Sequence, residues 1–276
     1  MMIKDVVLNL SIKQTYDAAA EYAIAVAGEF DAHLAGIAFA YEPVLPATVM
    51  GGIPSDFIDA QRIENENAAN GVVEKFKTAA TRAGISAESR TLGSSVAGAA
   101  DTFGRMARRF DLAIVGQAEP NQTAAEDLIA EAAMFQSGRP VIVVPYIHKG
   151  GLKLDRVLVC WDGSRAAARA IGDAIPVLER AKAVDVVMVL GEEGKRDQIP
   201  GADMGHHLAR HRINVDVKRI VAQGEVQSTL LSYAADVSAD LIVMGAYGHS
   251  RLREFILGGV TRSMLASMTV PCFMSH

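Results

Sequence analysis

The chain has 276 residues, of which 50% are hydrophobic, 6% are aromatic and 21% are charged. Its formal net charge of −5 argues against a protein that binds the backbone of nucleic acids, because such proteins are usually basic. No apolar run approaches the roughly 18 residues that a membrane span needs. The first residues lead into a predicted strand without a secretory leader, so we expect a cytoplasmic protein. Cys160 and Cys272 fall in predicted buried strands, as structural thiols of a reducing compartment do.

Apolar strand-like runs and longer helical segments alternate along the first half of the chain. Strands are predicted at 5–10, 34–40, 85–91, 111–116 and 140–145, and helices at 16–30, 58–83, 95–109 and 123–136. Between the second strand and the next helix, the loop region 43–57 is long enough to cover a crevice.

The second half repeats this alternation. Strands are predicted at 155–160, 184–190, 214–221, 240–245 and 270–274, and helices at 165–181, 202–212, 226–238 and 259–267. Alternation of this kind implies parallel strands joined by right-handed crossovers, in an open sheet with helices on both faces.

Internal repetition indicates a duplicated domain. Three pairs of strand segments share their pattern and their order: 5–10 with 155–160, 111–116 with 240–245, and 139–145 with 269–274. A period this long excludes a solenoid unit. We therefore predict one domain at 1–148 and a second at 152–276, joined by the short hinge 148–151.

The glycines after the predicted strand 240–245 form the most informative motif. Gly245 and Gly248 follow the strand, and Gly258 and Gly259 precede a predicted helix that continues with Val260 and Thr261. Glycine allows a ligand to approach the backbone closely, and the first amides of a helix attract anions. The spacing favours a phosphate-binding site, and the alternative is a loop that only turns the chain.

This pattern, Gly-x2-Gly-x9-Gly followed by a small residue, resembles the nucleotide-binding signature of the universal stress protein family. The segment 157–164 is similar to the first strand of that family, which ends in Asp-x-Ser, here Asp162 and Ser164. The closing segment 270–274 resembles its last strand. The resemblance covers nearly all of 152–276.

The resemblance implies an adenine-nucleotide-hydrolase-like fold with the strand order 3-2-1-4-5 in each half. In that order, Asp162 and Gly245 lie at the same crevice, because ligands bind where the strand order reverses. The family further implies that Asp162 contacts the nucleoside, that the backbone of Val189 meets the base, and that the four glycines hold the phosphates of ATP with Mg²⁺.

Two features depart from the family pattern. Gly259 stands where nucleotide-binding members usually carry Ser or Thr, so a hydroxyl is missing, and Thr261 offers a partial substitute. The first half lacks both motifs and has Glu119 where its charge would repel a phosphate. We therefore expect the first half to be a degenerate copy that keeps the fold.

Several residues also have structural interpretations. Asp162 and Ser164 can cap the following helix, Trp161 can pack beside the crevice, and arginines 251, 253 and 262 can form a solvated face instead of neutralising phosphate. Histidines 206, 207 and 211 lie on a predicted helix, but no carboxylate or cysteine motif accompanies them, so zinc is disfavoured.

We expect a tandem stress protein that binds an adenine nucleotide in its second domain and has a regulatory or protective role. The alternative is an interaction module that has kept the fold without the ligand. No motif of a dedicated enzyme is present, and weak ATP hydrolysis stays open.

We expect no nucleic acid and no membrane as partners. Strands 140–145 and 270–274 should pair within the chain, and a homodimer stays open.

Overall fold

The structure is a computed structural model that describes residues 2–12, 16–43, 55–119, 125–190, 201–222, 224–246 and 259–276. Gly248, Gly258, Arg251 and Arg253 therefore lie outside the described residues, as does most of the loop 43–57.

Both halves alternate strand and helix as the sequence predicts. The N-terminal half consists of β1 (Asp5–Leu10), α1 (Ala18–Phe30), β2 (His33–Tyr41), α2 (Ser55–Arg82), β3 (Ala87–Ser94), α3 (Val96–Ala107), β4 (Leu112–Gly116), α4 (Ala125–Gln136) and β5 (Val141–Val144). The C-terminal half consists of β6 (Arg156–Cys160), α5 (Arg165–Leu178), β7 (Ala183–Leu190), α6 (Gly201–Arg210), β8 (Val215–Val221), α7 (Val226–Asp236), β9 (Leu241–Gly245), α8 (Gly259–Ser267) and β10 (Cys272–Ser275).

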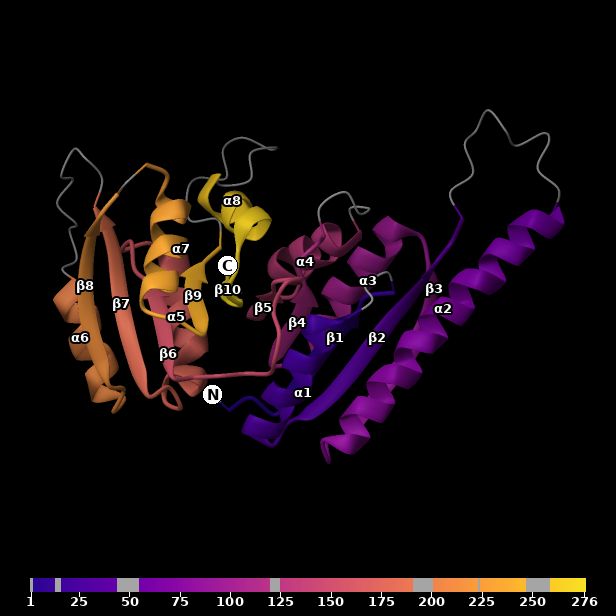
Figure 1. The fold of residues 1–276 in the computed structure, drawn as a ribbon, viewed down its shortest axis with the longest axis horizontal. Coiled ribbons are helices and arrows are strands. Elements are labelled where there is room, and N and C mark those ends of the chain that lie inside the picture. Colours follow the sequence, from indigo (N-terminus) through magenta and orange to yellow (C-terminus); the bar gives the residue numbers. More distant parts are fainter. Residues whose placement is uncertain are drawn as a thin grey trace.

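All ten strands form one sheet in the order β3-β2-β1-β4-β5-β10-β9-β6-β7-β8. Within each half, this is the strand order 3-2-1-4-5 with parallel neighbours, so the predicted doubly wound α/β fold is confirmed. The two five-stranded parts are joined where β5 and β10 pair antiparallel, with Cys272 opposite Val143 and Met274 opposite Val141. Figure 1 shows these two strands at the centre of the molecule.

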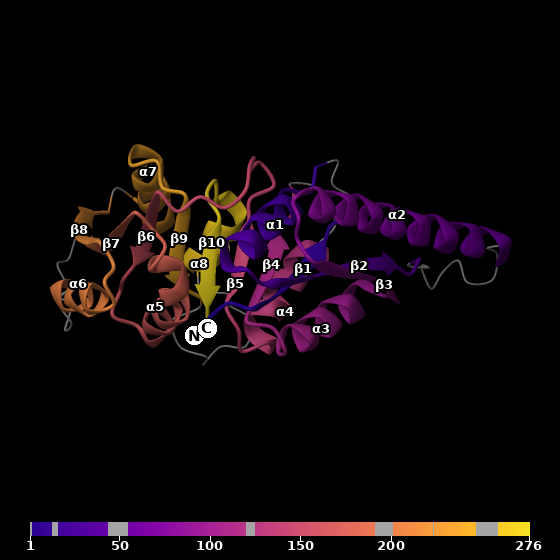
Figure 2. The same ribbon diagram turned by 90° about the horizontal axis from the view of Figure 1, so that it is seen from below.

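The burial of each strand follows its place in the sheet. β4 is buried at every residue, since helices cover both faces of a central strand. The edge strands β3 and β8 instead mix exposed and partly buried residues. Figure 2 shows the helices on both sides of the sheet, with the 28-residue α2 running along the N-terminal half.

Two hydrophobic cores hold the helices to the sheet, and each core crosses from one half to the other. One core gathers buried residues of α1, α2, α5 and α6, and the other gathers those of α3, α4, α7 and α8. Burial of this apolar surface stabilises the fold by roughly 25 cal/mol per Å². The halves are therefore joined by packed side chains as well as by strand pairing.

Direct contacts outside the sheet also tie the halves together. Arg180, in the turn after α5, pairs with Glu29 of α1 at 3.3 Å and lies 4.2 Å from the centre of the Phe30 ring. The rings of Phe135 and His276 meet edge to face with 5.0 Å between centroids.

Candidate functional site

In the C-terminal half, the strand order reverses between β6 and β9. These neighbours run parallel, with Val157 opposite Leu241 and Val159 opposite Val243, so their carboxyl ends share one edge of the sheet. Asp162 follows β6, and Gly245 ends β9. The structure therefore places Asp162 and Gly245 at the same edge of the sheet, although about 80 residues separate them in sequence.

A tight turn between β6 and α5 carries Asp162 and Ser164. The Ser164 backbone N–H donates to Asp162 Oδ1 at 2.9 Å, and the Ala167 N–H donates to Ser164 Oγ at 3.1 Å. Gly163 between them has φ of +75°, a conformation that side chains disfavour. Ser164 thus acts as the N-cap of α5. Asp162 is exposed, so its carboxylate faces the open edge of the sheet while one oxygen supports the turn.

Gly245 is required for close packing. A Cβ at this position would lie 2.5 Å from both the Ala166 carbonyl carbon and the Ala167 nitrogen. The end of β9 therefore touches the first turn of α5, which brings Gly245 beside the helix that Ser164 caps. The sequence analysis explained Gly245 only as a glycine that lets a ligand approach the backbone. It did not predict the contact with α5, because nothing in the sequence shows which helix lies against Gly245.

Gly259 begins α8, and its surroundings are open. A Cβ there would meet nothing within 4 Å, and its φ lies outside the left-handed region. Val260 is 38% exposed, while Thr261 is buried at 4% exposure. A ligand can therefore reach the first turn of α8, where helix amides have no intrahelical acceptor. Thr261 faces the core, so the structure does not favour its hydroxyl as the substitute for the one missing at Gly259.

The predicted site residue Val189, and Trp161, which was expected to pack beside the site, lie at the carboxyl ends of the neighbouring strands β7 and β6. Val189 is partly buried near the end of β7, opposite Ile220 of β8. Trp161 is 5% exposed at the end of β6, and its indole N–H has no hydrogen-bond partner within the part of the chain that the structure describes. A buried donor without a partner costs free energy, so a polar ligand at this edge would have a group to bind.

Cys160 and Cys272 are free thiols, as expected. Burial raises the pKa of Cys160 to about 12, and the neighbouring Asp162 charge adds to the effect. Burial also raises the pKa of Cys272. Both side chains therefore stay protonated near neutral pH, and a thiolate is the form that reacts or binds metal.

The corresponding crevice of the N-terminal half is acidic. Glu126, in the first turn of α4, is 4% exposed, and its Oε1 accepts from Ser11 Oγ at 3.0 Å. The Ser11 backbone N–H donates to Asp17 Oδ2 at 3.2 Å, and Asp17 also caps α1 through Ala20. Ser11 thus joins two carboxylates at the end of β1.

Burial raises the pKa of Asp17 to about 6. The backbone hydrogen bonds from Ala20 and Ser11 oppose this rise, whereas the charge of Glu126 increases it. Carboxylates in this position repel a phosphate. The sequence analysis assigned this repulsion to Glu119, which is partly buried after β4, and missed Asp17 and Glu126. An acidic first turn in the predicted helix 123–136 was the signal that could have identified Glu126.

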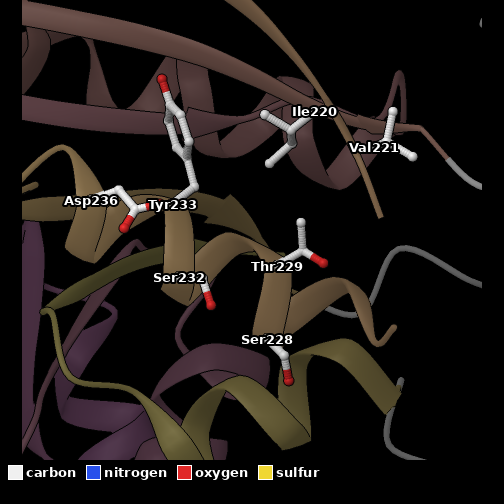
Figure 3. Close-up of a pocket in the computed structure, with 7 residues that line it drawn as sticks. All are labelled: Ile220, Val221, Ser228, Thr229, Ser232, Tyr233 and Asp236. Carbon is white, nitrogen blue, oxygen red and sulfur yellow. The ribbon is translucent and has the colours of Figure 1, made fainter. Parts of the chain in front are cut away.

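A separate hollow of about 310 Å³ lies between β8 and α7 (Figure 3). Its lining combines apolar and hydroxyl side chains: Ile220, Val221, Ser228, Thr229, Ser232, Tyr233 and Asp236. Ser228 and Ser232 point away from Ile220 in Figure 3, so the polar groups do not converge on one point. The Tyr233 hydroxyl donates to Asp185 Oδ2 at 3.4 Å. Asp185 also forms an ion pair with Arg156, so the polar groups of Tyr233, Asp185 and Arg156 bind one another and have a structural role.

The histidines predicted on one helix are surface residues of α6 and the turn after it. The rings of His207 and His211 lie 5.0 Å apart. Across the described ranges, no group of three or more His, Cys, Asp or Glu side chains is arranged to hold a metal ion. Within the same ranges, no helix has the length and apolarity to cross a membrane.

The model of the Universal stress protein family matches residues 153–276. A universal stress protein of Synechocystis sp. is 25% identical over 170 residues, which are 59% of this chain and 56% of that protein. This chain thus spans just over half the length of that relative.

Solved structures show the same fold. A universal stress protein from Archaeoglobus fulgidus aligns with a TM-score of 0.71 at 20% identity, over 98% of this chain and 96% of that one. A putative universal stress protein from Pseudomonas aeruginosa aligns with a TM-score of 0.58 at 14% identity, over 99% and 93%. Residues 153–276 therefore match the Universal stress protein family model, and the N-terminal half repeats the same strand order.

Proposed function

We propose that the protein binds one adenine nucleotide per chain in the crevice of its C-terminal half, as ATP with Mg²⁺. The nucleotide would serve a regulatory or protective role in the response to stress. The observation that carries the proposal is the contact of Gly245 with the first turn of α5, because it brings the two motifs together at the point where the strand order reverses.

Each part of the crevice suits one part of the ligand. Asp162 presents an exposed carboxylate that can accept hydrogen bonds from ribose hydroxyls. The first turn of α8 at Gly259 presents amides and the positive end of a helix dipole, which suit phosphate. The N-terminal crevice has Glu126 and Asp17 in the corresponding region, which supports a single site per chain.

Titration calorimetry of the full chain with ATP and Mg²⁺ tests this proposal. We expect about one ATP per chain, and mass spectrometry of small molecules released from freshly purified protein should detect an adenine nucleotide. Two equivalent sites would contradict the role given to Glu126 and Asp17.

Asp162→Asn tests the carboxylate without removing the turn, because the amide oxygen can still accept from the Ser164 N–H. We expect weaker binding of both ATP and adenosine, by about three- to tenfold, because a hydrogen bond to a charged carboxylate becomes a weaker one to a neutral amide. Asp155→Asn is the matched control, since Asp155 precedes the opposite end of β6. Equal affinities for the Asp162 variant and the wild type would remove Asp162 from the site.

A second function, an interaction module without nucleotide, is favoured by one observation. Asp162 and Ser164 are both used in the turn that starts α5, so their presence is explained without a ligand. The absence of ATP binding at millimolar nucleotide with Mg²⁺ would support this alternative.

A further inference from the structure

Gln117 directly follows β4 in the N-terminal half, and its side chain crosses to the other half. Its backbone N–H donates to Val144 O at 2.8 Å, as the N–H of Ala246 donates to Ser275 O in the C-terminal half. The two residues therefore occupy matching positions, but Gln117 has a long amide where Ala246 has a methyl group. The side chain of Gln117 is 5% exposed.

Both ends of the Gln117 amide are hydrogen-bonded. Nε2 donates to the backbone carbonyl of Leu265 in α8 at 2.7 Å, and Oε1 accepts from the Tyr146 N–H at 3.4 Å. The opposite orientation of the amide would place oxygen against oxygen at Leu265, so the contacts define which end points to α8.

Leu265 lies in the last turn of α8, where carbonyl groups lack the intrahelical partner that earlier turns have. Gln117 therefore caps the C-terminal end of a helix in the other half of the chain. α8 has nine residues, fewer than an isolated helix needs to be stable. Its buried side chains are Thr261 and Met264, and Leu265 is partly buried against the core, so the bond from Gln117 adds a polar contact to this small apolar anchor.

The other end of α8 is the first turn at Gly259, six residues from Leu265 and thus about 9 Å away along the helix. We propose that Gln117 is a positioning residue, through which the N-terminal half holds α8 in place and so sets the arrangement of phosphate-binding amides in the C-terminal half. This inference rests on the proposed nucleotide site and gives the degenerate half a role in it.

Gln117→Leu tests the inference, because leucine preserves most of the buried volume and removes both hydrogen bonds. In titrations of the full chain with Mg²⁺, we expect ATP affinity to fall about three- to tenfold. Adenosine affinity should stay within about twofold, since adenosine has no phosphate to contact α8. A variant that only loosened the fold would lower both affinities.

Arg180→Gln is the matched control. It removes another link between the halves, the ion pair with Glu29 and the contact with the Phe30 ring, which starts from the turn after α5 and does not involve α8. We expect this variant to lose thermal stability while its ATP affinity stays the same. Equal ATP affinity in Gln117→Leu and wild type, or an equal fall for ATP and adenosine, would overturn the inference.

Hydrogen exchange without nucleotide separates this inference from the proposed function. Amides of residues 263–267 should exchange about three- to tenfold faster in Gln117→Leu than in wild type or Arg180→Gln, because the C-terminal end of α8 has lost its anchor. If wild type binds no ATP, the proposed function fails, and this measurement still decides whether Gln117 holds α8. Unchanged protection of α8 would refute the anchoring role.

Discussion

Gly245 and Gly259 differ in how much space surrounds their α-carbons. Gly245 has no room for a Cβ, because the backbone of Ala166 and Ala167 lies against it. Gly259 has open space around it and no left-handed backbone conformation. At the residue scale, the first glycine maintains the packing of β9 against α5, and the second lies where an added side chain would meet open space.

Gly245→Ala should therefore destabilise the fold by about 1–3 kcal/mol, since the added methyl group must displace the start of α5. Denaturant unfolding would measure this loss. Gly259→Ala is the control, and we expect its free energy of unfolding to change by less than about 0.5 kcal/mol. Equal stability of the two variants would contradict the close packing at Gly245.

Gly259→Ser should supply the hydroxyl that the family resemblance implies at this position in a nucleotide site. Serine fits because neither space nor φ opposes it. We expect ATP affinity to rise about two- to tenfold while adenosine affinity is unchanged, because the hydroxyl can reach only the phosphate end. Calorimetry with both ligands measures this contrast. A parallel gain for adenosine would place the phosphates away from α8.

At the scale of elements, the starts of α1 and α5 show how the two halves diverged. α5 begins with Ser164, a neutral cap in an open crevice, whereas α1 begins with Asp17, a carboxylate beside Glu126. Because burial raises the pKa of Asp17 to about 6, its ionised form opposes folding. The cap hydrogen bonds favour the ionised form, but burial outweighs them, so protonation of Asp17 stabilises the folded protein.

Asp17→Asn should reveal this cost as a pH dependence. The folded protein holds the Asp17 proton up to about pH 6, whereas the unfolded chain releases it near pH 4, so this group's stabilisation is lost as pH rises between these values. Asparagine still caps helices well. The stability of the variant relative to wild type should increase by ~1–3 kcal/mol between pH 4 and pH 7, measured by urea unfolding. A constant difference across this range would show that Asp17 does not titrate there.

At the scale of the whole molecule, the antiparallel pair of β5 and β10 makes the two halves one sheet. Every residue of β10 is buried, and without β5 this strand would become an exposed edge. Exposed apolar edges pair with other chains. The inter-half contacts of Arg180, Phe135 and Gln117 would be lost at the same time.

We therefore expect a fragment of residues 152–276 to self-associate, through β10 or by aggregation. Size-exclusion chromatography with light scattering would measure its mass against that of the full chain. A stable monomeric fragment at tens of micromolar would show that the C-terminal half does not need the strand it pairs with.

The sequence by itself was sufficient for the order of helices and strands and for the duplication, because these features follow from local periodicity and repeated segments. The strand order within each half did not follow from these patterns and was implied only by the family resemblance. The sequence also brought Asp162 and Gly245 to one crevice, because the strand order alone determines which strand ends are neighbours.

Only the tertiary structure decided what the individual side chains contact. Glu126 reaches Ser11 across 115 residues, Gln117 reaches Leu265 across 148, and Gly245 lies against α5. Such contacts depend on how each helix is placed and rotated against the sheet, which is set by packing of the whole core and not by local pattern. For this reason the sequence indicated a candidate ligand-binding motif but missed the carboxylates Asp17 and Glu126 at the end of β1 and the link from Gln117 to α8.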